Sequence, residues 1–214
     1  MTDQQPPATP PMRALWALTV LLLAIEGLLQ LSDLGLTDIT RRWAYTHGAF
    51  WRPLIFDEVQ PAFDLQPYSM FITHAFLHSG IIHVVMNTVI LLSIGRMVVM
   101  FCGELRMLVL FAVTAIAGGA GFALLGPDGL IPMVGASGAA FGFMAAWKRW
   151  EFTALRASGR PITPVLQFIG TMTVLNIALH FGLGGTLAWQ AHLGGALAGW
   201  LIAPPLLRRA RTAR

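Results

Sequence analysis

The segment MVGASGAAFGF, residues 133–143, combines glycine, alanine and bulky apolar residues with one hydroxyl group, that of Ser137. Two interpretations fit it. Small residues let transmembrane helices approach closely, so the segment could serve helix packing alone. Gly135 and Gly138 beside a serine also leave backbone free around a nucleophile, whose oxyanion needs nearby N–H groups. The segment by itself favours packing, and the choice depends on whether a base accompanies the serine.

A serine nucleophile needs a general base, and histidine is the usual one. Four of the six histidines fall near the outward ends of two apolar segments, THAFLHSGIIHVVMN and WQAHLGGALAGW. His192 in the second segment is followed at i+3 and i+7 by Gly195 and Gly199, a small face that lets another helix approach. The glycines of residues 133–143 form a similar face. If the two faces meet, Ser137 and His192 lie opposite one another.

A carboxylate that could orient His192 is missing from the apolar segments. No Asp or Glu falls in the expected second, fourth or sixth segment. Asp128, shortly before Ser137, suits a polar turn. The sequence therefore predicts a Ser–His dyad without a third member. Asn176 and His180, in the expected fifth segment, are interpreted as a structural polar pair.

His83 and Asn87 are four residues apart and so share one face of a helix. Polar side chains within a membrane are candidates for function, and these two could donate hydrogen bonds to an oxyanion. A hydrogen bond between helices explains them equally well. His74 and His78 raise the possibility of a metal site, but no carboxylate or cysteine accompanies them and HExxH is absent. We expect no metal or organic cofactor, and expect His74 and His78 to line the rim of the site.

The elements that position these residues are strongly apolar. Of the 214 residues, 56% are hydrophobic and 11% are charged, with a mean hydropathy of +0.66. Soluble domains carry about 25% charged residues. The apolar residues gather in stretches, several of them near the length of ~20 residues that spans a bilayer. These stretches cover residues near 13–31, 70–101, 105–126, 130–147, 162–183 and 188–207. The fold class predicted is an all-α polytopic membrane protein with six spans.

The distribution of basic residues predicts the topology. With six spans and both termini in the cytoplasm, eleven of the fourteen basic residues lie inside and only Arg41, Arg42 and Arg52 lie outside, as the positive-inside rule expects. The terminal RRARTAR is interpreted as an anchor at lipid headgroups, not as a nucleic-acid site. The domain division predicted is a disordered tail over 1–12, a membrane domain over 13–207 with an exofacial loop at about 32–70, and a basic cytoplasmic tail over 208–214.

The fourth segment has an unusual length. It must end at Lys148 and Arg149, and the stretch GPDGLIP before it breaks helices repeatedly. Counting back to Gly135 predicts a helix of roughly thirteen residues, which is too short for a full span. We therefore expect the helix to begin below the outer surface, with Ser137 near its N-terminus, where free N–H groups favour negative charge.

Three motifs occur in a fixed order on these segments: THAFLHSGIIHVVMN, then GASGAAFG, then QAHLGGALAG. This ordered set resembles the rhomboid family of intramembrane serine proteases, over roughly residues 65–205. The sequence departs from the usual family pattern in two places. Tyr68 and Ser69 stand where many members have Trp-Arg, and Val99 stands where many have a glutamate between two glycines.

The resemblance implies a six-transmembrane-helix rhomboid-like bundle that cleaves transmembrane segments of single-span or polytopic substrates in the lipid bilayer. Ser137 would be the nucleophile and His192 the general base. By the same resemblance, His83, Asn87 and the backbone of Ser137 would stabilise the oxyanion. Gly135, Gly138, Phe141, Gly195 and Gly199 would be structural residues near the site. The location implied is the inner membrane of a prokaryote, with the site open to the exofacial side. The alternative is a non-catalytic rhomboid-like protein that binds transmembrane helices in trafficking or quality control.

Overall fold

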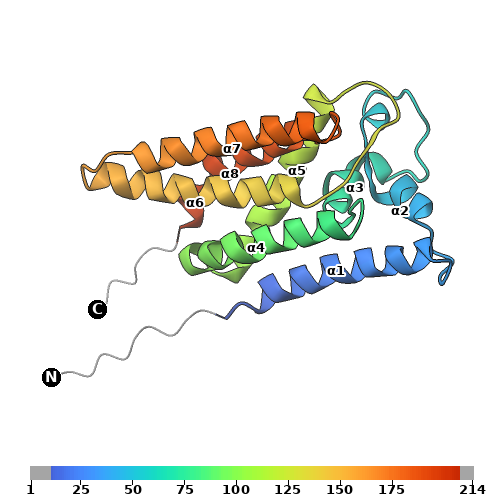
Figure 1. The fold of residues 1–214 in the computed structure, drawn as a ribbon, viewed down its shortest axis with the longest axis horizontal. Coiled ribbons are helices and arrows are strands. Elements are labelled where there is room, and N and C mark those ends of the chain that lie inside the picture. Colours follow the sequence, from blue (N-terminus) through green and yellow to red (C-terminus); the bar gives the residue numbers. More distant parts are fainter. Residues whose placement is uncertain (1–10, 208–214) are drawn as a thin grey trace.

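The apolar stretches form helices because a backbone in hydrocarbon must satisfy its own hydrogen bonds. The computed structural model describes residues 11–207, in which six helices of 18 to 22 residues lie side by side (Figure 1). They are α1 (Arg13–Asp33), α4 (Ile81–Cys102), α5 (Glu104–Leu125), α6 (Ser137–Ala157), α7 (Thr163–Gly182) and α8 (Trp189–Leu206). Four of them, α1, α4, α5 and α7, are long and apolar enough to cross a membrane.

The connection between α1 and α4 is ordered and not a plain loop. It contains two helices of eight residues, α2 (Arg41–Gly48) and α3 (Gln66–Thr73), and the 3-10 turns η1 (Arg52–Leu54) and η2 (His74–Phe76). The two-residue strand β1 (Phe50–Trp51) pairs antiparallel with β2 (Pro132–Met133). The strand pair ties this connection to the segment just before Ser137. The expectation of one loop over 32–70 is therefore corrected.

Packing is densest among α5, α6 and α8. Helix α6 lies against α8 and α5, and α5 also lies against α8, while α1 packs mainly on α4. The core is continuous through these helices and includes Phe111, Phe143 and Trp150. Helix α7 lies at the edge of the bundle, where Val165 is its one fully buried residue. The candidate residues of the sequence therefore lie on the best-packed helices, with α7 as a looser neighbour.

One end of the bundle joins three helix termini. The Ala14 amide donates to Glu104 Oε1 over 2.6 Å, which joins the start of α1 to the start of α5. Arg106 Nη1 donates to the Leu206 carbonyl over 3.1 Å, which brings the end of α8 to the same place. The described chain therefore begins and ends at one end of the bundle (Figure 1). The tail at 208–214 and all but the last two residues of the tail at 1–12 lie outside the described residues.

Two predicted boundaries are wrong. The second apolar stretch was expected to start near residue 70, but α4 starts at Ile81, because His74–Phe76 forms a separate turn and Gly80 has a φ of 144°. The fourth helix starts at Ser137 but has 21 residues, not about thirteen. It continues past Lys148 because that ammonium pairs with Glu151 over 2.6 Å and lies 4.0 Å from the Trp147 ring centre. A charge paired and covered in this way does not end the helix.

Candidate active site

The backbone just before α6 leaves space for groups around Ser137. Gly135 has a φ of 125°, in the region that favours glycine, and its N–H donates to the His74 carbonyl over 2.9 Å. A Cβ at Gly135 would lie 2.8 Å from His83 Nε2 and 3.8 Å from Ser137 Oγ. Ser137 is the first residue of α6, where backbone N–H groups have no partner within the helix. His83, Gly135 and Ser137 therefore surround one small space at a helix N-terminus.

Ser137 and His192 are in direct contact. Ser137 Oγ lies 2.8 Å from His192 Nε2, and the imidazole is buried at 5% exposure. The contact depends on the close approach of α6 and α8. A Cβ at Gly195 would collide with the Gly138 carbonyl oxygen, and a Cβ at Gly199 would collide with that of Gly142. The two small faces noted in the sequence thus lie against each other at backbone distance.

The other nitrogen of His192 has a partner that the sequence reasoning missed. His192 Nδ1 lies 2.8 Å from Asn176 Oδ1, an acceptor on α7. The pairing of Asn176 with His180 was wrong, because His180 Nδ1 lies 3.1 Å from the Leu187 carbonyl instead. Asn176 could have been recognised from the sequence because a polar amide in an apolar membrane segment is a candidate for function.

Phe141 covers one face of the His192 ring. The two rings are stacked, with centroids 4.2 Å apart and an interplanar angle of 8°. Phe141 lies one turn after Ser137 on α6, so the same helix that supplies the hydroxyl also supports the imidazole. Ring stacking and the Asn176 contact together leave the imidazole little freedom to rotate.

His83 presents one nitrogen to the site. The Ser79 N–H donates to His83 Nδ1 over 3.4 Å, and Ser79 Oγ lies 3.0 Å from the same atom. Because Nδ1 accepts from the backbone, the proton of a neutral ring is on Nε2, the nitrogen that faces Gly135. Asn87 is buried, and its Nδ2 donates to the His83 carbonyl over 2.9 Å. An amide nitrogen has two protons, so Asn87 keeps one further donor.

Comparison with known proteins identifies the family of the chain. The rhomboid domain matches residues 65–209 of the chain. The chain belongs to the rhomboid family. The resemblance noted in the sequence is therefore confirmed, and the family together with the apolar helices identifies this rhomboid chain as an integral membrane protein.

Two curated relatives of the rhomboid chain are similar over a common region. Rhomboid protease GluP of Bacillus subtilis (strain 168) is 32% identical over 138 residues, which are 63% of this chain and 25% of that protein. RHOMBOID-like protein 5 of Arabidopsis thaliana is 30% identical over 133 residues, which are 62% of this chain and 42% of that protein. The matched region therefore spans less than half of either relative.

His74 and His78 of the rhomboid chain are buried next to the site and do not line its rim. Both are buried, at 1% and 0% exposure. His74 Nε2 lies 3.3 Å from the Ala115 carbonyl, and His78 Nε2 accepts from the Ala136 N–H over 3.4 Å. Within residues 11–207, no three His, Cys, Asp or Glu side chains come together in a way that could hold a metal ion. These two histidines support the backbone just before Ser137, because the His74 carbonyl accepts from the Gly135 N–H and the His78 ring accepts from the Ala136 N–H.

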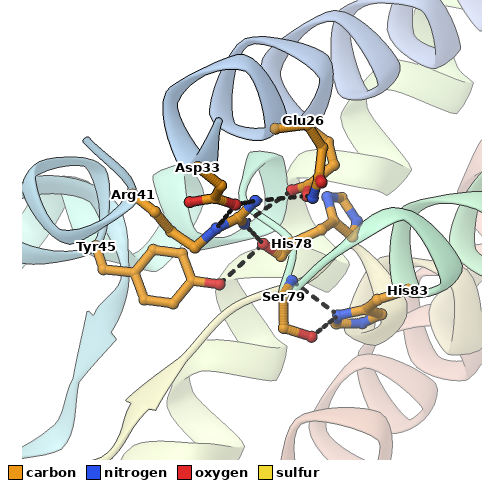
Figure 2. A network of polar contacts seen from close by, with 8 residues as sticks. Glu26, Asp33, Arg41, Tyr45, His78, Ser79 and His83 are labelled. Carbon is orange, nitrogen blue, oxygen red and sulfur yellow. Dashed lines mark hydrogen bonds and ion pairs between the residues drawn. The ribbon is translucent and has the colours of Figure 1, made fainter. Parts of the chain in front are cut away.

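An ion-pair cluster holds the segment that carries Ser79 and His83 (Figure 2). Arg41 Nη2 lies 2.8 Å from Glu26 Oε1 on α1, so the buried Glu26 carboxylate has a counter-charge. Arg41 Nη1 and the Tyr45 hydroxyl each donate to the His78 carbonyl over 2.8 Å. Burial raises the pKa of the Tyr45 hydroxyl, which keeps its proton available for donation. The cluster joins α1 and α2 to the residue before Ser79.

Replacing Arg41 with Gln in the rhomboid chain is expected to destabilise the fold by about 3 kcal/mol, because it leaves the buried Glu26 carboxylate without its counter-charge. Thermal unfolding in detergent measures the loss. The neighbouring Arg42 is exposed, so Arg42→Gln is the matched control and should match wild type. Adding Glu26→Gln to Arg41→Gln should recover part of the stability. Equal stability of Arg41→Gln and Arg42→Gln would contradict the structural role of the cluster.

Proposed function

We propose that this rhomboid chain is an intramembrane serine endopeptidase that cleaves transmembrane segments through an acyl-enzyme. The observation that carries the proposal is the 2.8 Å contact between Ser137 Oγ and His192 Nε2. A serine and a histidine in hydrogen-bonding contact are the minimal pair for nucleophilic catalysis. The relative from Bacillus subtilis is named rhomboid protease GluP, which supports the same activity.

In the proposed reaction, His192 Nε2 accepts the Ser137 hydroxyl proton while Oγ attacks the carbonyl carbon of the scissile peptide bond. The oxyanion that forms accepts hydrogen bonds from the Ser137 backbone N–H and from His83 Nε2–H, with Asn87 as a further donor. The tetrahedral intermediate collapses, the C–N bond breaks, and the His192 proton passes to the leaving amine. His192 then takes a proton from water, whose oxygen attacks the acyl carbon. A second collapse releases the acid and returns the proton to Ser137.

We infer six spans for the membrane domain at 13–207, with both termini in the cytoplasm. The shared end of α1, α5 and α8 supports an even number of crossings, and the excess of basic residues on the inferred inner side supports the orientation. The exofacial side then holds α2, α3 and the entrance to the site. The proposed location is the inner membrane of a prokaryote, where the substrates are single-span or polytopic membrane proteins surrounded by lipid.

The test is cleavage in a defined membrane. The purified protein is reconstituted in lipid vesicles with a single-span substrate that carries helix-destabilising residues near its outer end, and the products are mapped by mass spectrometry. We expect one cut near the outer end of the substrate span, with no loss of activity in the presence of chelators. Binding of the span without any cut, in wild type as in Ser137→Ala, would instead support the non-catalytic helix-binding alternative.

His83→Ala is expected to lower kcat for this substrate about 10²- to 10³-fold with little change in KM, because it removes a donor to the oxyanion. Vesicle assays at several substrate densities separate the two constants. His47→Ala is the matched control, since that ring stacks on Trp43 in α2 and should not change kcat. A wild-type kcat in His83→Ala would remove His83 from the proposed mechanism.

A further inference from the structure

We propose that Asn176 is a positioning residue for His192, the third member of a Ser–His–Asn arrangement, and that it ties the orientation of the base to the seating of α7. This inference rests on the proposed peptidase function. Its geometric basis is the 2.8 Å contact between Asn176 Oδ1 and His192 Nδ1. No carboxylate takes part, so the arrangement differs from a triad completed by an acid.

The Asn176 contact selects the tautomer that the reaction needs. The amide oxygen is an acceptor only, so His192 Nδ1 must carry the proton and donate it. In the neutral ring, Nε2 then has a free lone pair, and this is the atom that faces the Ser137 hydroxyl at 2.8 Å. Without an acceptor at Nδ1, the proton could move to Nε2, and His192 could no longer accept from Ser137. The amide oxygen thus holds the imidazole in its basic form toward the nucleophile.

An amide suits this place better than a carboxylate. The wall on which Asn176 lies is apolar, and an ionised group there would be costly to bury. The amide supplies the acceptor without a charge. Phe141 stacks on the ring, which limits its tilt but does not distinguish Nδ1 from Nε2. Asn176 therefore determines which ring nitrogen of His192 carries the proton.

Asn176 lies on α7, which has fewer buried residues than any other long helix of the bundle. Along α7 only Val165 is fully buried. An apolar cavity of about 860 Å³ lies between α7 and the helices α6 and α8, and Asn176 and His192 both line it. Phe168 of α7 lines this cavity, and its ring contacts the Trp147 ring of α6. A shift of α7 away from α8 would draw the amide oxygen from Nδ1 while leaving Ser137 and His192 on their own helices. Asn176 therefore orients the His192 imidazole only while α7 is packed against α8.

The test compares three variants of the full-length protein in lipid vesicles. Asn176→Leu is close in size and has no acceptor, whereas Asn176→Asp keeps an acceptor oxygen at the same place. Thr173 lies one turn earlier on α7, lines the same cavity and bonds only to the Ile169 carbonyl of its own helix among the described contacts. Thr173→Val is therefore the matched control. Each variant is measured for kcat and KM with the single-span substrate and for its rate of labelling by a fluorophosphonate.

We expect Asn176→Leu to lower kcat and the labelling rate about 10- to 100-fold while KM stays near that of wild type, since one oriented hydrogen bond is lost. Asn176→Asp should recover part of the lost rate, because its carboxyl oxygen can still accept from Nδ1 although a carboxyl group is costlier on this apolar wall. Thr173→Val should equal wild type. A wild-type kcat in Asn176→Leu, or a loss that Asn176→Asp does not relieve at all, would overturn the inference. If Asn176→Leu does not fold, Asn176→Ala takes its place under the same criteria. Wild-type protein that neither cuts nor labels would overturn the proposed function itself, which is a separate result.

Discussion

Replacing Ser137 with Ala is expected to reduce kcat for the single-span substrate by about 10⁵- to 10⁶-fold, because no nucleophile remains to form the acyl-enzyme. The fold should be unaffected, since alanine only removes the Oγ atom that contacts His192. Single-turnover cleavage in lipid vesicles, with a long time course to detect residual product, measures the loss. Substrate binding, followed by cross-linking, should remain at the wild-type level.

If Ser137 and His192 act together, the losses of kcat in the single variants should not add in the double variant. His192→Ala alone should cost nearly as much as Ser137→Ala, and the double variant little more than either, because the two residues act as a unit. Ser158→Ala is the control: Ser158 is the C-cap residue directly after α6, at the other end of that helix from Ser137, and its hydroxyl donates to the Ala154 carbonyl. Cleavage that persists in Ser137→Ala, at more than about one hundredth of the wild-type rate, would exclude Ser137 as the nucleophile.

The second large effect concerns stability. Gly199→Ala is expected to destabilise the bundle by about 3 kcal/mol, because the added Cβ would collide with the carbonyl oxygen and Cα of Gly142, which are backbone atoms that cannot turn aside. Relief of the clash requires α8 to move away from α6, which would also lengthen the distance from Ser137 to His192. Unfolding in detergent, followed by the fluorescence of the tryptophans, gives the free energy of unfolding.

Gly170→Ala is the matched control for this substitution. Gly170 lies inside α7, and a Cβ there would have no neighbour within 4 Å. Alanine favours a helix over glycine by up to about 1 kcal/mol, so Gly170→Ala should leave stability unchanged or slightly raised. Equal effects of Gly170→Ala and Gly199→Ala would contradict the close approach of α6 and α8.

The pairing of α6 with α8 could be anticipated because small residues recur at helical spacing. Gly195 and Gly199 follow His192 by three and seven residues, and a small face has few uses in a membrane helix besides close packing. Once the faces are placed together, the depth of Ser137 and His192 follows from their positions on the two helices. The spacing of small residues along a helix is a local property of the chain, so it can be recognised from a single sequence.

Other features depend on contacts that have no local pattern. Asn176 meets His192 only because α7 lies at a certain rotation and depth beside α8, and its sequence neighbours do not reveal this. Phe50 and Met133 pair as strands across more than eighty residues of chain. Arg41 was counted only as an exofacial charge, whereas it reaches the buried Glu26. In each case the partner is distant in sequence, so the residue type is visible but the contact is not.

The length of α6 was misjudged for a related reason. Lys148 and Arg149 look like the end of a span when charge alone is read along the sequence. In the structure, Lys148 pairs with Glu151 on the next turn and lies over the Trp147 and Phe168 rings. The ring of Phe168 comes from α7, so the feature that shields this charge and lets the helix continue is a tertiary one.

Fluorophosphonate labelling can show whether Ser137 is a nucleophile activated by His192, and it needs no substrate. Wild-type protein in lipid vesicles is treated with the probe, digested and mapped by mass spectrometry. We expect a covalent adduct on Ser137, no adduct in Ser137→Ala, and labelling of His192→Ala slower by at least about 10³-fold. An adduct on another residue, or wild-type labelling of Ser137 in His192→Ala, would contradict it.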